Sequence, residues 1–324
     1  MSSLGILSRA TAACDPAILG GLAAVVDRAA FRSSARRADI WRANLEWLAI
    51  PPPAADPGAP RHARPPRLLA NHLSMHAETL AMLAGRRFDL AIAGEEHLRR
   101  ALEIAATGNG AGTASRAATG NDAGTANRAA TGSRTGDVHG DAARGGLVLA
   151  TAHVGNWNLG ALLVAEIAGR PVHSVAGVQI LPAWTAPLRR AYRRLGIRVH
   201  PGGTDARRLL AILRRGGIVG LHLDGDQHRG PSLASRGVAL LALRSRSPIL
   251  PGVCHRLPRG RFLARFLPPI VPARPGERPD LDGLQRRIEE AFRAIVASAP
   301  EQWILFRPLG PPPAAPAPER SCAS

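Results

Sequence analysis

The sequence predicts an α/β protein: a single three-layer α/β sandwich with a mostly parallel central sheet. Short apolar runs alternate along the chain with segments of helical spacing, which is the pattern of a sheet covered by helices. The first clear run, Leu147–Ala152, is apolar without interruption, as expected for a parallel strand that is buried on both faces. This strand and helix alternation continues to residue 270.

The elements follow in order after that first strand. The predicted helices are Asn158–Gly169, the basic Pro182–Gly196, Thr204–Gly217 with Thr204 as its cap, and Val238–Ser247. The predicted parallel strands are Val172–Val178, Ile197–His200 and Ile218–Asp224. The runs Ile249–Leu257 and Arg261–Ile270 are expected to form an antiparallel pair.

The carboxy-terminal segment from Leu281 predicts an outer helix that packs on the sheet. Its apolar residues fall on one stripe at helical spacing: Leu281, Leu284, Ile288, Ala291, Phe292 and Ile295. A core contact is the interpretation for this stripe.

Composition divides the chain into unequal parts. We expect an amino-terminal helical segment at 1–50, a Pro-rich connector at 51–66, the main folded domain at 67–307 and a disordered tail at 308–324. Within the domain, residues 106–144 hold a short repeat with almost no large apolar side chain, which predicts a disordered low-complexity insertion.

Charge narrows the classes of partner. The 42 basic residues are all arginine and outnumber the 24 acidic ones, giving a net charge of +18. The absence of lysine excludes Schiff-base chemistry and a P-loop. Such a surplus favours anionic lipid surfaces, acidic carrier proteins, phosphorylated ligands or nucleic acid, but the few aromatic residues and the lack of a binding motif argue against nucleic acid.

Neither disulfides nor a membrane span are predicted. Cys14, Cys254 and Cys322 are odd in number and lack metal-ligand spacing, which favours a reducing compartment. The apolar run Ala17–Val26 is half the length of about 20 residues that a spanning helix needs. A cytoplasmic protein that binds a membrane surface is the expectation.

One histidine occupies a position suited to catalysis. His153 follows the strand Leu147–Ala152, at the sheet edge where ligands of such folds gather. The turn that continues through Gly155, Asn156 and Trp157 is expected to present backbone N–H groups to an anion or a developing oxyanion.

These segments resemble the lipid A biosynthesis acyltransferases, the lauroyl and myristoyl transferases of the lysophospholipid acyltransferase superfamily. "GGLVLATAHVGNWNLGALLV" is similar to their active-site segment. "HLSMHAETLAML", "AIAGEEHLRRAL", "GGIVGLHLDGDQHRG", "LLALRSRSPILPGVCHRLPRGRF" and "IEEAFRAIVASAPEQWILF" resemble further blocks of the family in the same order. The resemblance covers about Arg36 to Arg307, interrupted by the repeat tract.

The resemblance implies acyl transfer from an acyl carrier protein or acyl-CoA thioester to a hydroxyl of a glycolipid or lysolipid, without a metal or redox cofactor. It places this activity peripherally at the cytoplasmic face of the inner membrane. In the family motif a histidine removes the acceptor's proton, and an Asp or Glu five residues later orients it. His153 matches the base, but Asn158 stands where the acid is expected.

Three other carboxylates are considered as the partner of His153 in place of the missing acid. Glu166 lies eight residues beyond Asn158, about 12 Å along a helix, and is too far to reach. Asp224 and Asp226 follow another predicted strand, so either is a hypothesis for the partner of His153. An Asn158 amide that faces the imidazole through its oxygen is the other possibility, at a cost in rate.

Other polar residues have two interpretations each. His72 and His76 have the i, i+4 spacing of a metal site near Glu78, but the sequence shows no third ligand and we assign no metal. The resemblance gives Glu78 a structural or substrate-channel role. Arg190 and Arg194 belong to an arginine stripe that faces either solvent or a phosphate, the latter being what the resemblance implies.

Three functions therefore compete at the level of sequence. The first is an active O-acyltransferase at an anionic membrane surface. The second is a non-catalytic relative that binds an acyl chain or lipid, for which Asn158 is the main observation. The third, a nucleic-acid-binding protein, rests on charge alone.

Overall fold

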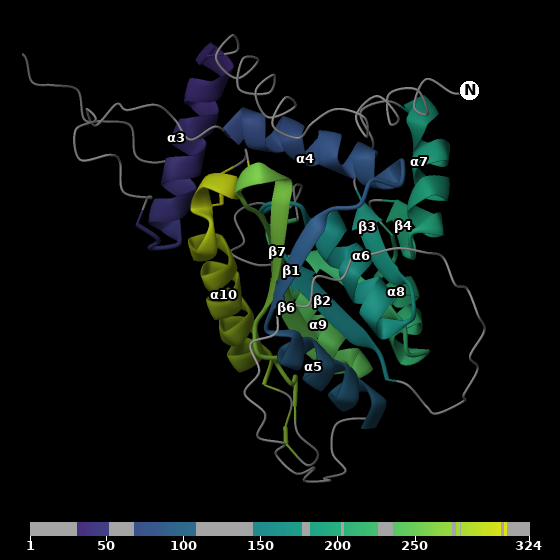
Figure 1. The fold of residues 1–324 in the computed structure, drawn as a ribbon. Coiled ribbons are helices and arrows are strands. Elements are labelled where there is room, and N and C mark those ends of the chain that lie inside the picture. The colour runs from purple at the N-terminus through teal and green to yellow at the C-terminus, as the bar shows by residue number, and fades with distance from the viewer. Residues whose placement is uncertain are drawn as a thin grey trace, which may run out of the picture.

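A seven-stranded sheet with the order β1-β7-β6-β2-β5-β3-β4 forms the centre of the protein (Figure 1). The computed structural model describes residues 31–51, 68–107, 145–176, 182–201, 204–225, 236–273, 277–278, 280–305 and 308–309. The strands are β1 (Asp89–Ala93), β2 (Leu147–Thr151), β3 (Val172–Ala176), β4 (Ile197–Pro201), β5 (Ile218–His222), β6 (Ile249–Arg256) and β7 (Arg261–Phe266).

Helices surround this sheet in the described ranges. They are α3 (Phe31–Trp47), α4 (Leu68–Leu83), α5 (Glu95–Thr107), α6 (Trp157–Ala168), α7 (Pro182–Arg194), α8 (Ala206–Arg214), α9 (Arg236–Ser245) and α10 (Leu281–Ser298). Two short 3-10 turns, η1 (Pro258–Gly260) and η2 (Pro300–Gln302), follow β6 and α10. The α/β class with a mostly parallel sheet is thus confirmed.

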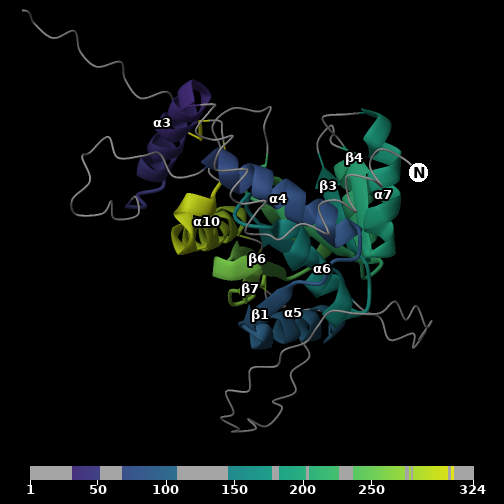
Figure 2. The same cartoon turned by 45° about the horizontal axis from the view of Figure 1, so that its top comes forward.

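Alternate side chains of β2 pack on opposite faces of the sheet. Leu147 and Leu149 belong to the core under α5 and α6, whereas Val148 and Ala150 belong to the core under α8, α9 and α10. All four are buried, which explains why this strand is apolar from Leu147 to Ala150. The helices on both faces make the three layers (Figure 2).

The strand pairing agrees with the predicted parallel inner strands and with the predicted antiparallel pair of the last two strands. β2 pairs in parallel with β5 and β6, and β6 pairs antiparallel with β7. β1, which pairs in parallel with β7, was not predicted. Its residues are exposed or half-buried, so it lacks the continuous apolar run by which an inner strand is recognised.

Helix α4 crosses one end of the sheet. Figures 1 and 2 both show it lying over the strands, and it contacts α6 and η2. Because α6 begins just after β2, this contact places α4 over the edge at which His153 lies. The amino-terminal part of the chain thereby reaches the carboxyl ends of the strands.

Two local predictions need correction. The cap of α8 is Asp205 and not Thr204, because the Asp205 carboxylate accepts the backbone N–H of Arg207 while the Thr204 hydroxyl bonds to the preceding turn. The insertion cannot begin at residue 106, since α5 runs through Thr107 with its apolar stripe on the core. The stripe of α10 is confirmed, with Phe292 fully buried at its centre.

Several sequence predictions fall outside the described residues. These are the segment 1–30, nearly all of the Pro-rich connector, residues 108–144 of the insertion and the tail from residue 310. Among the helices that the structure describes, none combines the length and the apolarity required to cross a bilayer.

The packing of α10 gives a first testable prediction. Phe292 is fully buried and its ring meets that of Trp303 edge to face, with ring centroids 6.0 Å apart. Phe292→Ala should lower the free energy of unfolding by about 3–5 kcal/mol through lost burial and an unfilled cavity. Urea denaturation measures this, with Glu290→Ala on the exposed side of α10 as the control. Equal stabilities of the two variants would contradict the packing described.

Candidate active site

His153 and Asp224 meet because their strands are neighbours in register. Thr151 of β2 lies opposite His222 of β5, and each strand is followed two residues later by one member of the pair. Asp224 Oδ1 lies 2.9 Å from His153 Nδ1, and the backbone N–H of His153 donates to Asp224 Oδ2 at 3.0 Å. Of the two carboxylates considered from sequence, Asp224 contacts the histidine, while Asp226 lies outside the described residues.

Asp224 is held by a third donor that the sequence analysis missed. The indole Nε1–H of Trp303, from the segment after α10, donates to Asp224 Oδ2 at 2.8 Å. Burial alone raises the pKa of this carboxyl, but electrostatic interaction with the His153 and His222 imidazoles and the hydrogen bonds from His153 and Trp303 together hold it well below its usual range. Asp224 is therefore a carboxylate, which only accepts hydrogen bonds.

The tautomer of His153 follows from that charge state. Since the carboxylate accepts, Nδ1 carries the proton and Nε2 has the lone pair. The side chain of His153 is 22% exposed, and its Nε2 has no hydrogen-bond partner among the described residues. The imidazole is thus oriented at one nitrogen and available as a base at the other.

Asn158 does not orient the histidine. Its Nδ2 donates to Thr79 Oγ1 of α4 at 3.1 Å, with Met75 Sδ a further 3.9 Å contact. The amide therefore ties α6 to α4. The sequence hypothesis that Asn158 faces the imidazole finds no support in this arrangement, in which Asp224 occupies the Nδ1 side.

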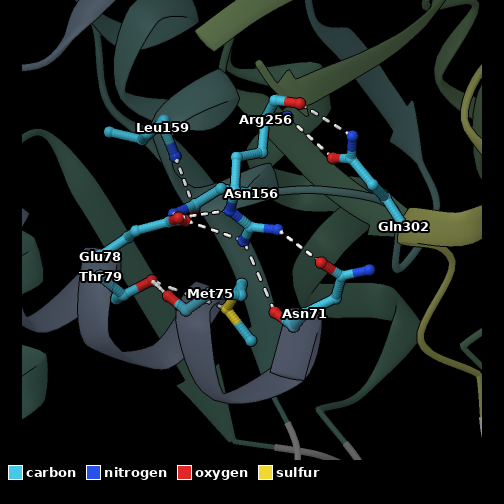
Figure 3. A network of polar contacts seen from close by, with 8 residues as sticks. All are labelled: Asn71, Met75, Glu78, Thr79, Asn156, Leu159, Arg256 and Gln302. Carbon is cyan, nitrogen blue, oxygen red and sulfur yellow. Dashed lines mark hydrogen bonds and ion pairs between the residues drawn. The ribbon is translucent and has the colours of Figure 1, made fainter. Parts of the chain in front are cut away.

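Asn156 and Glu78 lie in a buried polar network that joins α4 to the turn after His153 (Figure 3). Asn156 caps α6 through Oδ1, which accepts the Leu159 N–H, and its Nδ2 donates to Glu78 Oε2 at 3.1 Å. Glu78 also forms an ion pair with Arg256, whose Nε donates to Oε1 and whose Nη2 donates to Oε2 at 3.0 Å. Both oxygens of Glu78 are engaged, which favours the structural alternative for this residue.

Arg256 connects the network to two more segments. Its Nη1 donates to Asn71 Oδ1 of α4 at 3.2 Å, and its backbone N–H and C=O pair with the Gln302 amide at 2.8 Å each. Neither Asn71, Arg256 nor Gln302 was singled out from sequence, although all three lie close to or within the quoted family-like blocks. Only their convergence in space reveals them.

Two of the three turn amides that were expected to face an anion are used within the protein, and the expectation stays open for the Trp157 N–H alone. The Gly155 N–H donates to the Gln302 carbonyl at 3.2 Å and the Asn156 N–H to the Cys254 carbonyl at 2.8 Å. Neither is therefore free for an oxyanion. Gly155 has φ +62°, and a Cβ there would lie 2.0 Å from the Cys254 carbonyl oxygen, so only glycine fits.

An apolar pocket lies between α6 and the sheet, beside the His153 ring. Its lining consists of Leu149, Thr151, Trp157, Asn158, Gly160, Ala161, Val172, Ser174, Ile197, Gly220, His222, Gly252, Val253, Cys254 and Phe266. Two of these residues contact the imidazole of His153: Trp157 edge to face with ring centroids 4.9 Å apart, and His222 stacked at 4.2 Å.

Among the remaining sequence candidates, the arginines lie on α7 and the two histidines on α4. Arg190 and Arg194 are exposed on α7, which packs along the edge strand β4. His72 and His76 meet through their Nε2 atoms at 3.3 Å, and burial lowers the pKa of both, for His72 to about 4. Within the described ranges, no three His, Cys, Asp or Glu side chains are grouped to hold a metal ion.

A mostly parallel sheet with an oriented histidine at its carboxyl edge, beside an apolar pocket, is an arrangement suited to general-base chemistry on an apolar substrate. The family model described as "Bacterial lipid A biosynthesis acyltransferase" matches residues 136–309, more than half of the chain. The chain belongs to this family, whose general activity is acyl transfer in lipid biosynthesis. A comparison with curated proteins gives no significant match.

The matched range includes His153, Asp224, Arg256 and Trp303 but not α4. Glu78 and its neighbours on α4 nevertheless complete the polar network around the turn. The site is thus built jointly by the matched region and by the part of the chain before it.

The ion pair in this network provides the second prediction. The side chains of Glu78 and Arg256 are 9% and 18% exposed, so Glu78→Ala leaves a guanidinium largely buried without its partner. We expect a loss of about 3–5 kcal/mol in the free energy of unfolding. Glu95→Ala, which breaks the exposed pair with Arg99, is the control and should cost about 1 kcal/mol or less. Equal denaturation midpoints for the two variants would refute the structural role of Glu78.

Proposed function

We propose that this protein transfers a fatty acyl group from an acyl carrier protein or coenzyme A thioester to a hydroxyl of a glycolipid or lysolipid, with His153 as the general base. The observation that carries the proposal is the 2.9 Å contact between His153 Nδ1 and the buried Asp224 carboxylate, beside an apolar pocket. It supplies the acid that Asn158 does not.

The reaction follows from the orientation of the imidazole. His153 Nε2 takes the proton of the acceptor hydroxyl as its oxygen attacks the thioester carbon. The electron pair of the carbonyl moves to oxygen and then returns, breaking the C–S bond. The imidazolium gives its proton to the leaving thiolate, so that the products are an ester and a thiol. Asp224 stabilises the imidazolium between the two steps through its charge and its hydrogen bond.

The pocket under α6 suits the acyl chain. Its walls are mainly apolar, and the small residues Gly160, Ala161 and Gly220 leave the space between α6 and the strands. An alkyl chain in this space would be removed from water along its length, which is favourable by about 0.8 kcal/mol for each buried methylene. Its thioester end would lie beside His153, because Trp157 and His222 line the pocket and contact that ring.

The arginine surface supports a location at an anionic membrane face or beside an acidic carrier. The net charge is +18, and Arg190, Arg193 and Arg194 are exposed on α7. Basic surface residues are attracted to anionic headgroups and raise the rate of association with acidic partners. We therefore place the protein peripherally at the cytoplasmic face of the inner membrane, with the α7 arginines toward phosphate.

A non-catalytic lipid-binding relative is the second candidate, and the amide at position 158 favours it. The same pocket would then hold an acyl chain without turnover. The His153 and Asp224 geometry favours the enzyme, because a binding protein has no need of an oriented imidazole at the mouth of its pocket.

Turnover of dodecanoyl thioesters with a panel of glycolipid and lysolipid acceptors tests the proposal. His153→Ala should abolish transfer, and Asp224→Asn should lower kcat by about 10⁴-fold by favouring the wrong imidazole tautomer. Arg194→Ala, on the exposed face of α7, is a fold control whose melting temperature should match wild type. Lipid binding without turnover by wild-type protein would support the non-catalytic alternative instead.

A substitution at Asn158 tests whether Asp224 or the residue at position 158 holds the position of the acid that orients His153. Asn158→Asp should leave kcat unchanged or lower it, because Asp224 already occupies the Nδ1 side and Asn158 faces Thr79. The measurement is kcat of this variant in the wild-type and Asp224→Asn backgrounds. A gain over wild type would show that Asn158, rather than Asp224, holds the position of the catalytic acid.

Gly220 offers a test of the pocket. A Cβ at this position would lie 3.3 Å from Val172 Cγ1, so a larger side chain must enter the empty space under α6. Gly220→Leu should shift the preference from longer toward shorter acyl thioesters, measured as kcat/KM over a chain-length series. An unchanged length profile in a folded variant would place the acyl chain elsewhere.

A further inference from the structure

His222 is a second imidazole at the reaction centre that the mechanism above leaves without a role. It ends β5 opposite Thr151 and lines the pocket. Its ring stacks on that of His153 with centroids 4.2 Å apart and planes 14° from parallel, and it meets Trp157 edge to face. The residue thus lies between the base and the space assigned to the acyl chain.

One nitrogen of this imidazole is buried without a partner. His222 Nε2 is inaccessible to solvent and has no hydrogen bond to any residue that the structure describes. A buried polar atom of this kind costs free energy unless a ligand satisfies it. Burial, reinforced by the neighbouring His153 imidazole and only partly opposed by Asp224, lowers the pKa of His222 to about 3. The ring is therefore neutral, and in one tautomer its Nε2 is a hydrogen-bond donor.

Two amides of the turn after His153 are not available to an oxyanion. The Gly155 and Asn156 amides already donate to the carbonyls of Gln302 and Cys254. Acyl transfer places a negative charge on the carbonyl oxygen, and a donor aimed at this oxygen from a buried site is a large contributor to catalysis. A neutral imidazole beside the base can act as such a donor.

We infer that His222 is a catalytic residue whose Nε2–H donates a hydrogen bond to the carbonyl oxygen of the acyl donor. This inference rests on the proposed acyl transfer. When the acceptor oxygen attacks, the π pair of the carbonyl moves to the oxygen that Nε2–H contacts, while His153 takes the acceptor's proton. The pair returns as the C–S bond breaks and the thiolate receives that proton from His153, so His222 neither gains nor loses a proton.

Kinetics with dodecanoyl thioesters separate this role from a merely structural one. His222→Phe retains a ring to stack on His153 but has no nitrogen, and it should lower kcat by about 10²–10³-fold with little change in KM. His222→Gln restores a donor and should recover at least part of that loss. His173→Phe, the same substitution at a histidine outside the pocket, is the control and should retain wild-type kcat. Wild-type kcat in His222→Phe would overturn the inference.

A binding measurement gives an answer that does not depend on turnover. A 2-oxoalkyl coenzyme A ketone with a ¹³C-labelled carbonyl keeps the oxygen but has no C–S bond to cleave at that carbon. Bound to wild type, its carbonyl stretch should fall below the value in water-free solvent, and His222→Phe should reverse this shift. An unshifted stretch on wild type, or a shift retained in His222→Phe, would overturn the role of His222.

Different results overturn the proposed acyl transfer and the role of His222. Should wild type bind neither the ketone nor a dodecanoyl thioester, both the acyl-transfer proposal and the inference drawn from it are overturned. Should wild type transfer acyl groups, and His153→Ala be inactive while His222→Phe is fully active, only the role of His222 is lost.

Discussion

The buried Asp224 carboxylate is the group around which the site is organised. It accepts hydrogen bonds from the His153 ring, the His153 backbone and the Trp303 indole, and these donors come from two distant parts of the chain. A carboxylate removed from water is costly unless such donors satisfy it. The residues that compensate the charge are therefore also those that fix the direction of the imidazole.

The segment after α10 completes this arrangement from the other side. Residues 302–304 pair with the turn after β2: the Gly155 N–H donates to the Gln302 carbonyl, and the Ile304 N–H donates to the His153 carbonyl. The network of Glu78 and Arg256 then ties the same turn to α4. The turn is thus held by backbone pairing on one side and a buried ion pair on the other, so its Gly155 and Asn156 amides support the fold rather than a ligand.

Much of the fold could be predicted because its inner strands and outer helices have distinct patterns. β2 has four consecutive apolar, buried residues and α10 carries a single stripe, whereas the half-buried β1 has neither signal and was missed. For the site, the strand-end positions identified His153 and restricted its partner to Asp224 or Asp226. Trp303 and Arg256 could not be found in this way, because only the folded chain brings them to the turn, whereas His222 lies at the end of a predicted strand and was overlooked.

The central claim is that Asp224 fixes the imidazole of His153 with its proton on Nδ1. Nitrogen-15 NMR of the histidine side chains, with His153 assigned by the His153→Gln variant, measures the tautomer directly. The account predicts a neutral ring with a protonated Nδ1, and loss of this preference in Asp224→Asn. A wild-type His153 with its proton on Nε2, or a tautomer unchanged in Asp224→Asn, would contradict it.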